Sequence, residues 1–421
     1  MNSPPSRARI LLFTYSGSRI IDGKDMSEDL RKERLREPIS RSELERRWAA
    51  VREAMGKEGL DCLVMQNSNL YLGGYVRYFT DIPAENGYPM SVVFPIDGGI
   101  TIVSHGGKPL PTTPPEWALY GVKERVALPY LPTLNFTNKM ESDAVSKALK
   151  EKKAKSVGIV GKASMSATFH ENLMANLVGV KVSDATDLID EIKAVKSEEE
   201  IGLIKKTIEL QDKVWGATLA YIRPGVREYE LRSFIQWIST DLGSEEHLIS
   251  LGSAPAGKPA GQVRAFFQNR TMQRGDQVCV MIEVSGPGGF YGELGRTACL
   301  GEAPSKLLKV WDDAVEAQDR GAELLKPGSK PSELFEAHNR LLAGMGYPPE
   351  GRIHSHGQGY DLVERPGIRP EETMTVKRNM NIVIHPITLT GEAYAFCCDN
   401  YLVTNSGSIR LHKTPREIFV V

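Results

Sequence analysis

The 421-residue sequence is poor in cysteine, in excess charge and in long apolar runs. Its five cysteines are sparse and odd in number, which disfavours a disulfide-stabilised fold and predicts reduced thiols in a cytoplasmic protein. Lys plus Arg (52) nearly balance Asp plus Glu (53), which argues against a general nucleic-acid partner. No stretch approaches the roughly 18 apolar residues that cross a bilayer, so no membrane partner is expected.

The pattern along the chain predicts an arm and two domains. Residues 1–41 are mostly charged or small and are predicted to form an N-terminal arm. At Ser42 a helix is expected to begin, because Ser42 and Glu45 have the spacing of a capping box. Strand-like and helical segments then mix in residues 42–187, which indicates an α/β domain. A strongly helical stretch opens a second domain, predicted at residues 188–421.

The second half contains an internal repeat. Pro224-Gly225 is followed by Glu230-Leu231, and Pro327-Gly328 is followed at the same spacing by Glu333-Leu334, an offset of 103 (327 − 224). A β-rich segment follows each copy and ends in a polar residue. Glu283 lies 59 residues after its proline (283 − 224) and His385 lies 58 after its own (385 − 327). The repeat therefore predicts a curved sheet with pseudo-twofold symmetry, in which Glu283 and His385 are neighbours.

Several longer motifs resemble those of the creatinase and aminopeptidase P family, whose C-terminal domain has the pita-bread fold. The matching segments are residues 190–201 running on to Pro224-Gly225, then 274–276, 295–297, 356–359 and 400–404. Together they cover roughly residues 42–421. The resemblance implies a two-domain α/β protein with a C-terminal pita-bread domain. It also implies a homodimer whose site lies near the subunit contact.

The family's metallopeptidases bind two divalent ions with two Asp, one His and two Glu. Carried over residue by residue, these ligand positions fall on Glu283, Glu293, His356, His385 and Cys398, with Asp399 adjacent. Only the histidine is kept. Two further family histidines are also missing, since their positions fall near Val263 and Arg264 and near Val363. The resemblance therefore implies an atypical member that departs from the family's peptidases.

The residue types at these positions still suit a transition metal. Glu283, Glu293, His356, His385 and Asp399 are the candidate ligands, with Cys398 as an alternative to Asp399. Carboxylate and imidazole together favour one ion of Zn, Fe or Mn. In a metal-free site, Glu283 and His385 could instead act as catalytic base and acid. Hydrogen-bonded Glu and His pairs in a site that has lost its metal remain the alternative without catalysis.

The departures from the family pattern favour a small-molecule substrate that is not a peptide. The expected function is a hydrolase or lyase that cleaves a C–N or C–S bond in such a molecule. Two alternatives stay open at this point. One is a metal-dependent Xaa-Pro peptidase with atypical ligands, and the other is a non-catalytic small-molecule binding protein.

Overall fold

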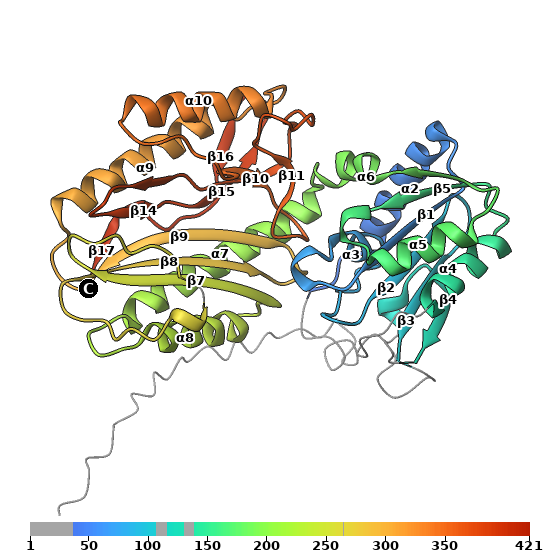
Figure 1. Cartoon of the computed structure of the whole chain (residues 1–421), viewed down its shortest axis with the longest axis horizontal. Coiled ribbons are helices and arrows are strands. Elements are labelled where there is room, and N and C mark those ends of the chain that lie inside the picture. The colour runs from blue at the N-terminus through green and yellow to red at the C-terminus, as the bar shows by residue number, and fades with distance from the viewer. Residues whose placement is uncertain (1–36, 107–115, 130–138, 264) are drawn as a thin grey trace, which may run out of the picture. The chain divides into compact units, whose positions relative to one another are not determined.

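The computed structural model describes residues 37–106, 116–129, 139–263 and 265–421 (Figure 1). Most of the predicted arm lies outside these residues. Its last part, residues 37–41, leads into the first described helix, and Ile39 is already buried there. None of the described helices is both long and apolar enough to cross a membrane.

The first described helix, α2 (Arg41–Glu58), begins earlier than the sequence predicts. Ser40 is its N-cap and accepts a hydrogen bond from the backbone N of Glu43 at 3.1 Å, so the predicted cap at Ser42 is wrong. The helix ends at Gly59, which has a φ of 64°. Only glycine adopts that left-handed conformation without steric cost, and this explains the sharp stop.

A six-stranded mixed sheet forms the first half of the described chain. Its strand order is β4-β3-β2-β1-β5-β6, with β1 antiparallel to β2 and parallel to β5. The strands are β1 (Cys62–Asn67), β2 (Met90–Pro95), β3 (Ile100–His105), β4 (Val122–Leu128), β5 (Ser156–Val160) and β6 (Lys181–Asp184). The helices that follow α2 are α3 (Gly74–Thr80), α4 (Met140–Glu151), α5 (Ala167–Asn176) and α6 (Thr186–Lys193). The predicted domain boundary at residues 187 and 188 falls within α6 and stays a prediction.

The second half consists of two helix pairs, two larger sheets that meet along one line, and a separate two-stranded sheet. One sheet has the order β17-β9-β8-β7 and the other has the order β11-β10-β12-β15-β16. The two are bridged between Gly295 and Cys398. The first copy comprises α7 (Glu198–Tyr221), α8 (Glu228–Asp241), β7 (Glu246–Pro255), β8 (Asp276–Ser285) and β9 (Tyr291–Cys299). The second comprises α9 (Ser305–Leu324), α10 (Pro331–Gly344), β10 (Ser355–Gly357), β11 (Glu364–Gly367), β12 (Asn381–Ile384), β13 (Ile387–Leu389), β14 (Tyr394–Phe396), β15 (Asp399–Val403), β16 (Ser408–Arg410) and β17 (Ile418–Val420).

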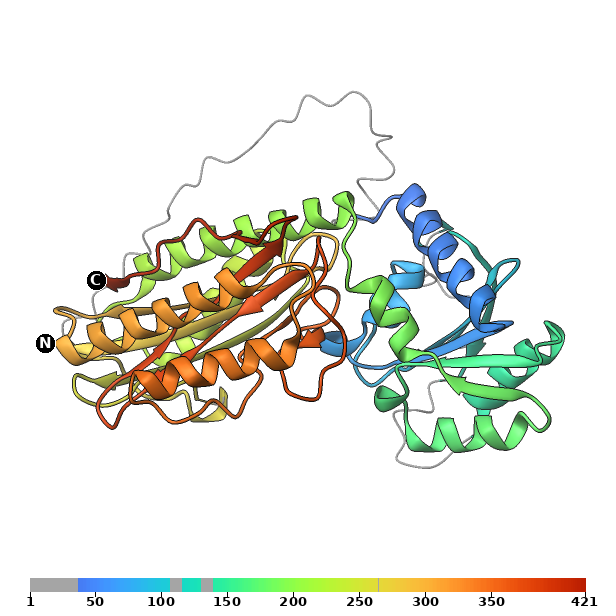
Figure 2. The same ribbon diagram turned by 90° about the horizontal axis from the view of Figure 1, so that it is seen from above.

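The predicted repeat corresponds to matching places in these two copies. Each Pro-Gly pair precedes the second helix of its copy, and β8 and β12 occupy equivalent positions on either side of the line where the sheets meet. Helices α7 and α8 cover β7–β9, while α9 and α10 cover the other sheet (Figures 1 and 2). The curved α/β architecture expected from the sequence is therefore present.

Strand alternation decides which side chains face the helices. In β8, Val278, Val280, Ile282 and Val284 pack in the core beneath α7 and α8. Cys279 and Met281 face the opposite side, where they pack with Val383 and Cys398 of the second copy. Successive side chains in a strand point to opposite faces. Glu283 therefore lies on the face that is turned away from α7 and α8.

Candidate metal centre

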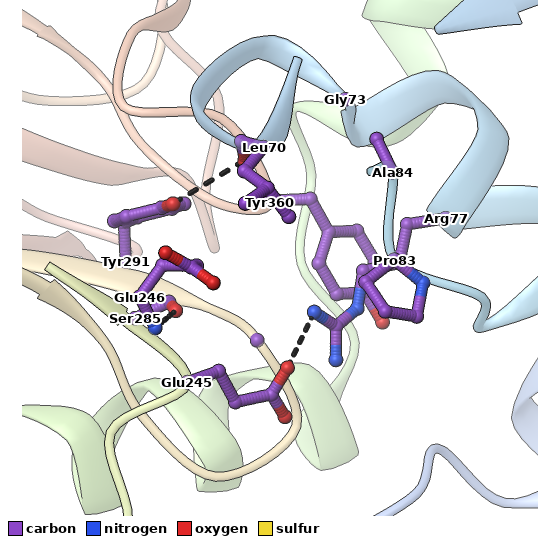
Figure 3. A pocket seen from close by; sticks show the side chains of 11 residues that line it. Leu70, Gly73, Arg77, Pro83, Ala84, Glu245, Glu246, Ser285, Tyr291 and Tyr360 are labelled. Atoms are coloured by element: carbon purple, nitrogen blue, oxygen red, sulfur yellow. Dashed lines mark hydrogen bonds and ion pairs between the residues drawn. The ribbon is translucent and has the colours of Figure 1, made fainter. Parts of the chain in front are cut away.

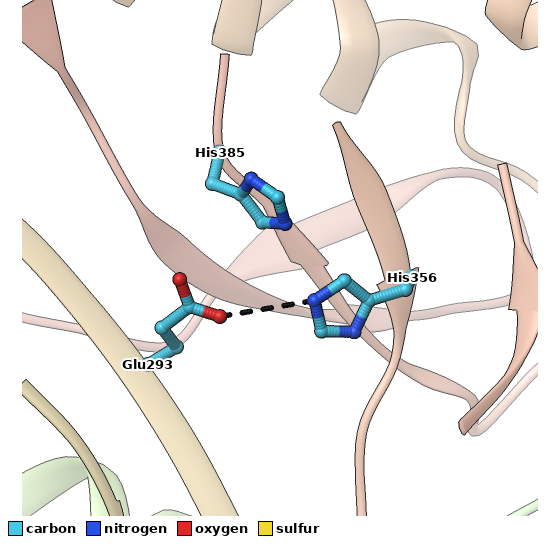
Figure 4. Close-up of side chains that lie close together, drawn as sticks. All are labelled: Glu293, His356 and His385. Carbon is cyan, nitrogen blue, oxygen red and sulfur yellow. Dashed lines mark ion pairs between the residues drawn. The ribbon is translucent and has the colours of Figure 1, made fainter. Parts of the chain in front are cut away.

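Three side chains from three different segments converge on this inner face. Glu293 in β9, His356 in β10 and His385 just after β12 each offer one ligand atom, and these atoms all lie within 4.8 Å of one another (Figure 4). Glu293 Oε2 lies 3.8 Å from His356 Nε2. The two imidazole rings have centroids 5.1 Å apart. All three side chains are buried, so the cluster is a polar site inside the sheet.

A backbone contact sets the tautomer of His356. Its Nδ1 lies 2.9 Å from the carbonyl oxygen of Gly357. Because a carbonyl can only accept, this contact places the proton on Nδ1 and leaves the lone pair on Nε2 facing Glu293. Metal-binding histidines commonly donate their second ring nitrogen in this way, which fixes the ring and raises its basicity.

His385 is the member of the cluster whose ring has an unmet hydrogen-bonding atom. Its Nδ1 is buried and has no hydrogen-bond partner among the described residues. Its backbone N donates to the carbonyl oxygen of His354 at 2.9 Å, which holds the residue at the end of β12. Burial and the nearby ring of His356 keep the pKa of His385 well below its usual range. The ring is therefore neutral at pH 7, as metal binding requires.

Glu283 lies beside this cluster and belongs to a neighbouring strand. It pairs directly with Glu293 across β8 and β9. Its Oε1 accepts a hydrogen bond of 3.0 Å from Gln358 Nε2, a partner that the sequence did not reveal. Burial raises the pKa of both carboxyl groups, and the charge of Glu293 raises that of Glu283 further. Glu283 is thus outside the three-residue group, and its partner in the strand register is Glu293. The contact between Glu283 and His385 that the repeat predicts stays a prediction.

Asp399 points away from the cluster. Its Oδ1 lies 2.7 Å from Arg296 Nη2, and both side chains are fully buried. Gln318 of α9 donates to its Oδ2 at 3.1 Å. Asp399 therefore faces the helix layer, and its charge is neutralised there by arginine. The structure does not bring this predicted ligand to the site.

Cys398 faces the other way. If Gly295 carried a Cβ, that atom would lie 2.8 Å from the Cβ of Cys398. Gly295 is two residues from Glu293 in β9, so Cys398 shares the face of Glu293. Its Sγ donates to the backbone oxygen of Glu293 at 3.5 Å. Burial and the charge of Glu293 keep the pKa of the thiol well above its usual range. Cys398 thus packs beside the cluster as a neutral thiol.

The positions of the missing family histidines give no substitute ligand. Val363 is exposed, and Val263 forms a bridge with Leu251 at the edge of β7. Arg264 lies outside the described residues. Neither valine offers an atom that binds a metal.

A small cavity lies further along the same face of the sheet (Figure 3). Ser285 and Tyr291 line it, and they pair across β8 and β9 two residues along from Glu283 and Glu293. The ion pair of Arg77 and Glu245, 2.7 Å apart, forms part of its wall. Its volume of about 70 Å³ is well below the roughly 300–1000 Å³ of small-molecule pockets. The cavity is therefore too small to enclose an ordinary small-molecule ligand.

A second pair of histidines packs next to the cluster. The rings of His338 in α10 and His354 are stacked, with centroids 3.8 Å apart and an interplanar angle of 7°. His354 is buried, and its carbonyl oxygen accepts the hydrogen bond from the backbone N of His385. Burial lowers the pKa of both rings, that of His338 to about 4. The ring planes are parallel, so their in-plane lone pairs cannot converge on one ion.

The low pKa of His338 makes acid stability a test of this packing. Below pH 6.5 the unfolded chain protonates this ring, whereas the folded protein keeps it neutral down to about pH 4. Stability should therefore fall as the pH drops through this window. We expect His338→Gln to reduce the slope of unfolding free energy against pH by about 1.4 kcal/mol per unit, the value for one proton. Urea unfolding of metal-free protein between pH 4.5 and 6.5 measures this difference. Glu283 and Glu293 oppose the trend equally in both proteins, and equal slopes would contradict the prediction.

The three clustered residues fit a single transition-metal ion. One carboxylate and two neutral imidazoles form a donor set typical of Zn or Fe. The buried Nδ1 of His385 also has no hydrogen-bond partner among the described residues, so this ring is not already held by another protein group through that atom. A pair of ions is harder to hold, because His385 and Cys398 occupy positions where bridging would need carboxylates. The site therefore suits one ion held by Glu293, His356 and His385.

Comparison with known proteins identifies the second half of the chain. Residues 202–411 match the model of metallopeptidase family M24. The chain thus carries an M24 peptidase-family domain, and its fold is the pita-bread fold of that family. An Xaa-Pro dipeptidase from Pyrococcus furiosus is 28% identical over 337 residues, which cover 79% of this chain and 92% of that protein.

Solved structures show the same fold over nearly the whole chain. The X-Pro aminopeptidase of Thermotoga maritima has a TM-score of 0.75 at 18% identity and covers 89% of this chain and 99% of its own. The prolidase of Pyrococcus horikoshii has a TM-score of 0.70 at 23% identity, with coverage of 89% and 100%.

These relatives correct the function that the sequence suggested. A lyase or a hydrolase of non-peptide molecules was expected because four of five family ligand positions differ. Curated relatives from Pyrococcus furiosus and Pyrococcus horikoshii are named as Xaa-Pro dipeptidases, and one from Mycobacterium bovis as a probable dipeptidase. The non-peptide interpretation is therefore wrong, and the peptidase alternative is the better supported one.

Proposed function

We propose that this protein is a metal-dependent peptidase that cleaves Xaa-Pro bonds with one transition-metal ion. The observation that carries this proposal is the buried convergence of Glu293, His356 and His385, whose ligand atoms lie within 4.8 Å of one another. The names of its relatives support the substrate class. The homodimer and the cytoplasmic location expected from the sequence stay predictions.

The proposed metal ligands are Glu293, His356 and His385. A bound ion would polarise the scissile carbonyl and activate a water molecule. Neutral imidazoles suit this role, because they bind the ion without a proton having to leave first. The hydrogen bond from His356 Nδ1 to Gly357 keeps that ring aimed at the site.

Glu283 is the proposed proton carrier. It stands opposite Glu293, and Gln358 fixes its Oε1. Burial raises the pKa of this carboxyl toward the working pH, and a group with such a pKa can both accept and return a proton. In this scheme Glu283 takes the proton of the attacking water. It then gives that proton to the proline nitrogen as the C–N bond breaks, which yields a free carboxylate and a free amine.

Metal reconstitution tests the proposal directly. Protein stripped with a chelator receives Zn, Co, Mn or Fe(II) in turn, and release of proline from Ala-Pro is measured. We expect turnover of about 1–1000 per second with at least one ion, the usual range for enzymes. Glu293→Gln should reduce it at least 100-fold at saturating metal, because it removes the charged ligand that neutralises the ion.

Glu302→Gln is the matched control. Glu302 is exposed and lies beyond the end of β9, so this change should leave turnover unaltered. Release of proline that persists unchanged in stripped protein would contradict the metal requirement. No release with any of the four ions would contradict the peptidase assignment.

A further inference from the structure

A buried cluster of ionised side chains lies beyond the metal centre. Lys193 Nζ at the end of α6 lies 2.7 Å from Asp361 Oδ2 and 2.6 Å from Glu364 Oε1. Lys196 Nζ lies 2.6 Å from Glu364 Oε2. All four side chains are buried. Burial alone would raise the pKa of Glu364, but the two lysines lower it, so this carboxylate is held ionised. Burial raises the pKa of Asp361, and the nearby Lys193 opposes that rise.

The two carboxylates belong to the segment that leaves the metal centre. We call residues 357–364 the site loop; it begins directly after His356 and ends at the start of β11. Gln358 in this loop donates to Glu283, and its own Oε1 accepts from Asn400 Nδ2 at 2.9 Å. The near end of the site loop therefore contacts Glu283 and directly follows His356, two of the ligands predicted from the sequence.

Residues from the first half of the chain hold the rest of the site loop. The backbone N of Gly74 donates to Asp361 Oδ1 at 2.7 Å, and the backbone N of Leu362 donates to the carbonyl oxygen of Tyr71 at 3.0 Å. A Cβ on Gly74 would lie 2.4 Å from Asp361 Oδ2, so glycine permits this close approach. The far end of the site loop is thus fixed from both sides.

We propose that Lys193 is a positioning residue that holds the site loop, and through it His356 and Gln358, in the geometry that binds the metal. Lys193 is the cation that contacts both carboxylates of the loop. Without Lys193, Asp361 would lose its lysine partner, and Glu364 would keep only Lys196. The two buried carboxylates would then repel each other more strongly. Their repulsion and their tendency to reach water would displace the loop. This inference rests on the proposed function, because it takes the cluster of Glu293, His356 and His385 as a metal site.

Metal affinity is the readout that separates positioning from general stability. Competition with a chromophoric chelator gives the Kd for Zn in wild type, Lys193→Met and Lys193→Arg. We expect Lys193→Met to raise the Kd about 10- to 100-fold, as loss of partners outside the ligand shell does elsewhere. Lys193→Arg keeps the charge and should recover most of the affinity. Lys57→Met is the control, since Lys57 is an exposed lysine in α2 that is paired with Glu53.

A milder variant covers the case in which Lys193→Met does not fold. Asp361→Asn keeps the shape of the side chain but weakens its contacts with Lys193 and Gly74, and should raise the Kd for Zn about 3- to 10-fold. In metal-free protein, amide hydrogen exchange across residues 357–364 should accelerate at least tenfold in either variant. Exchange in α4 should not change.

The outcomes separate the two proposals. If wild type binds no Zn, the metal centre itself is wrong. If wild type binds Zn but folded Lys193→Met, or Asp361→Asn in its place, binds within twofold of wild type, the positioning role of Lys193 is wrong. Equal losses in Lys193→Met and Lys57→Met would also overturn it, because the effect would then not depend on the site loop.

Discussion

His385→Glu is expected to move the metal preference of the protein from Zn toward Mn. The change replaces a neutral imidazole with a carboxylate at a position where the ligand atom lies within 4.8 Å of those of Glu293 and His356. Imidazole favours Zn and Fe, whereas oxygen ligands favour harder ions such as Mn and Mg. We expect the ratio of the Kd values for Zn and Mn to change at least tenfold in favour of Mn. Chelator competition with both ions measures the ratio.

The matched control for this exchange is His170→Glu. His170 lies in α5, which packs on the first sheet, so the same chemical change there should leave both affinities unaltered. A His385→Glu protein that binds Zn and Mn in the wild-type ratio would show that residue 385 does not touch the ion. The cluster would then need a different ligand set.

Arg296→Met is expected to give the largest loss of stability. Arg296 is fully buried, and its Nη2 lies 2.7 Å from Asp399 Oδ1. Its guanidinium also donates to the backbone oxygens of Cys398 and Pro415, at 2.9 and 2.8 Å. Removing one partner of a buried pair typically costs about 3–5 kcal/mol. Arg410 Nη1, 3.2 Å from Asp399 Oδ1, stays beside the carboxylate, so the expected loss is at the lower end of this range. Urea unfolding should show a decrease of that size in the free energy of unfolding.

Two comparisons make this result specific. Arg340→Met in α10 breaks an exposed contact of 3.4 Å with Glu336 and should change stability by less than about 0.5 kcal/mol. Asp399→Asn should lower stability while the metal content per chain stays at the wild-type value, because Asp399 faces the helix layer. A metal content that falls with Asp399→Asn in the folded protein would restore Asp399 as a ligand.

The curved sheet could be predicted because its signals are local and occur twice. Each Pro-Gly pair, the helix after it and the apolar strand that follows lie within a short segment, and a shared spacing links the two copies. The first helix cap was missed for an equally local reason. Ser40 and Ser42 both offer a hydroxyl near the start of the helix, and the structure uses the earlier one.

The site could be predicted only in part, because its partners come from distant segments. The residues at 293, 356 and 385 follow from the family resemblance. Gln358 reaches Glu283 across 75 positions, and Lys193 reaches Asp361 across 168. No periodicity in one sequence encodes such contacts. The face of Asp399 was also beyond prediction, since Cys397 and Cys398 are equally apolar and strand alternation alone does not say which side is inward.

The line between the two sheets would give the proposed metal centre a mechanical role. Glu293 belongs to the sheet of the first copy, whereas His356 and His385 belong to the second, and the backbones meet there at the bridge of Gly295 and Cys398. An ion at this point would be a removable crosslink between two halves of one duplicated structure. It adds about 4 kcal/mol to the folded state when its free concentration is 1000 times its Kd. Neither copy could then unfold without releasing the ion. Binding of the ion would therefore make the two copies unfold as one unit.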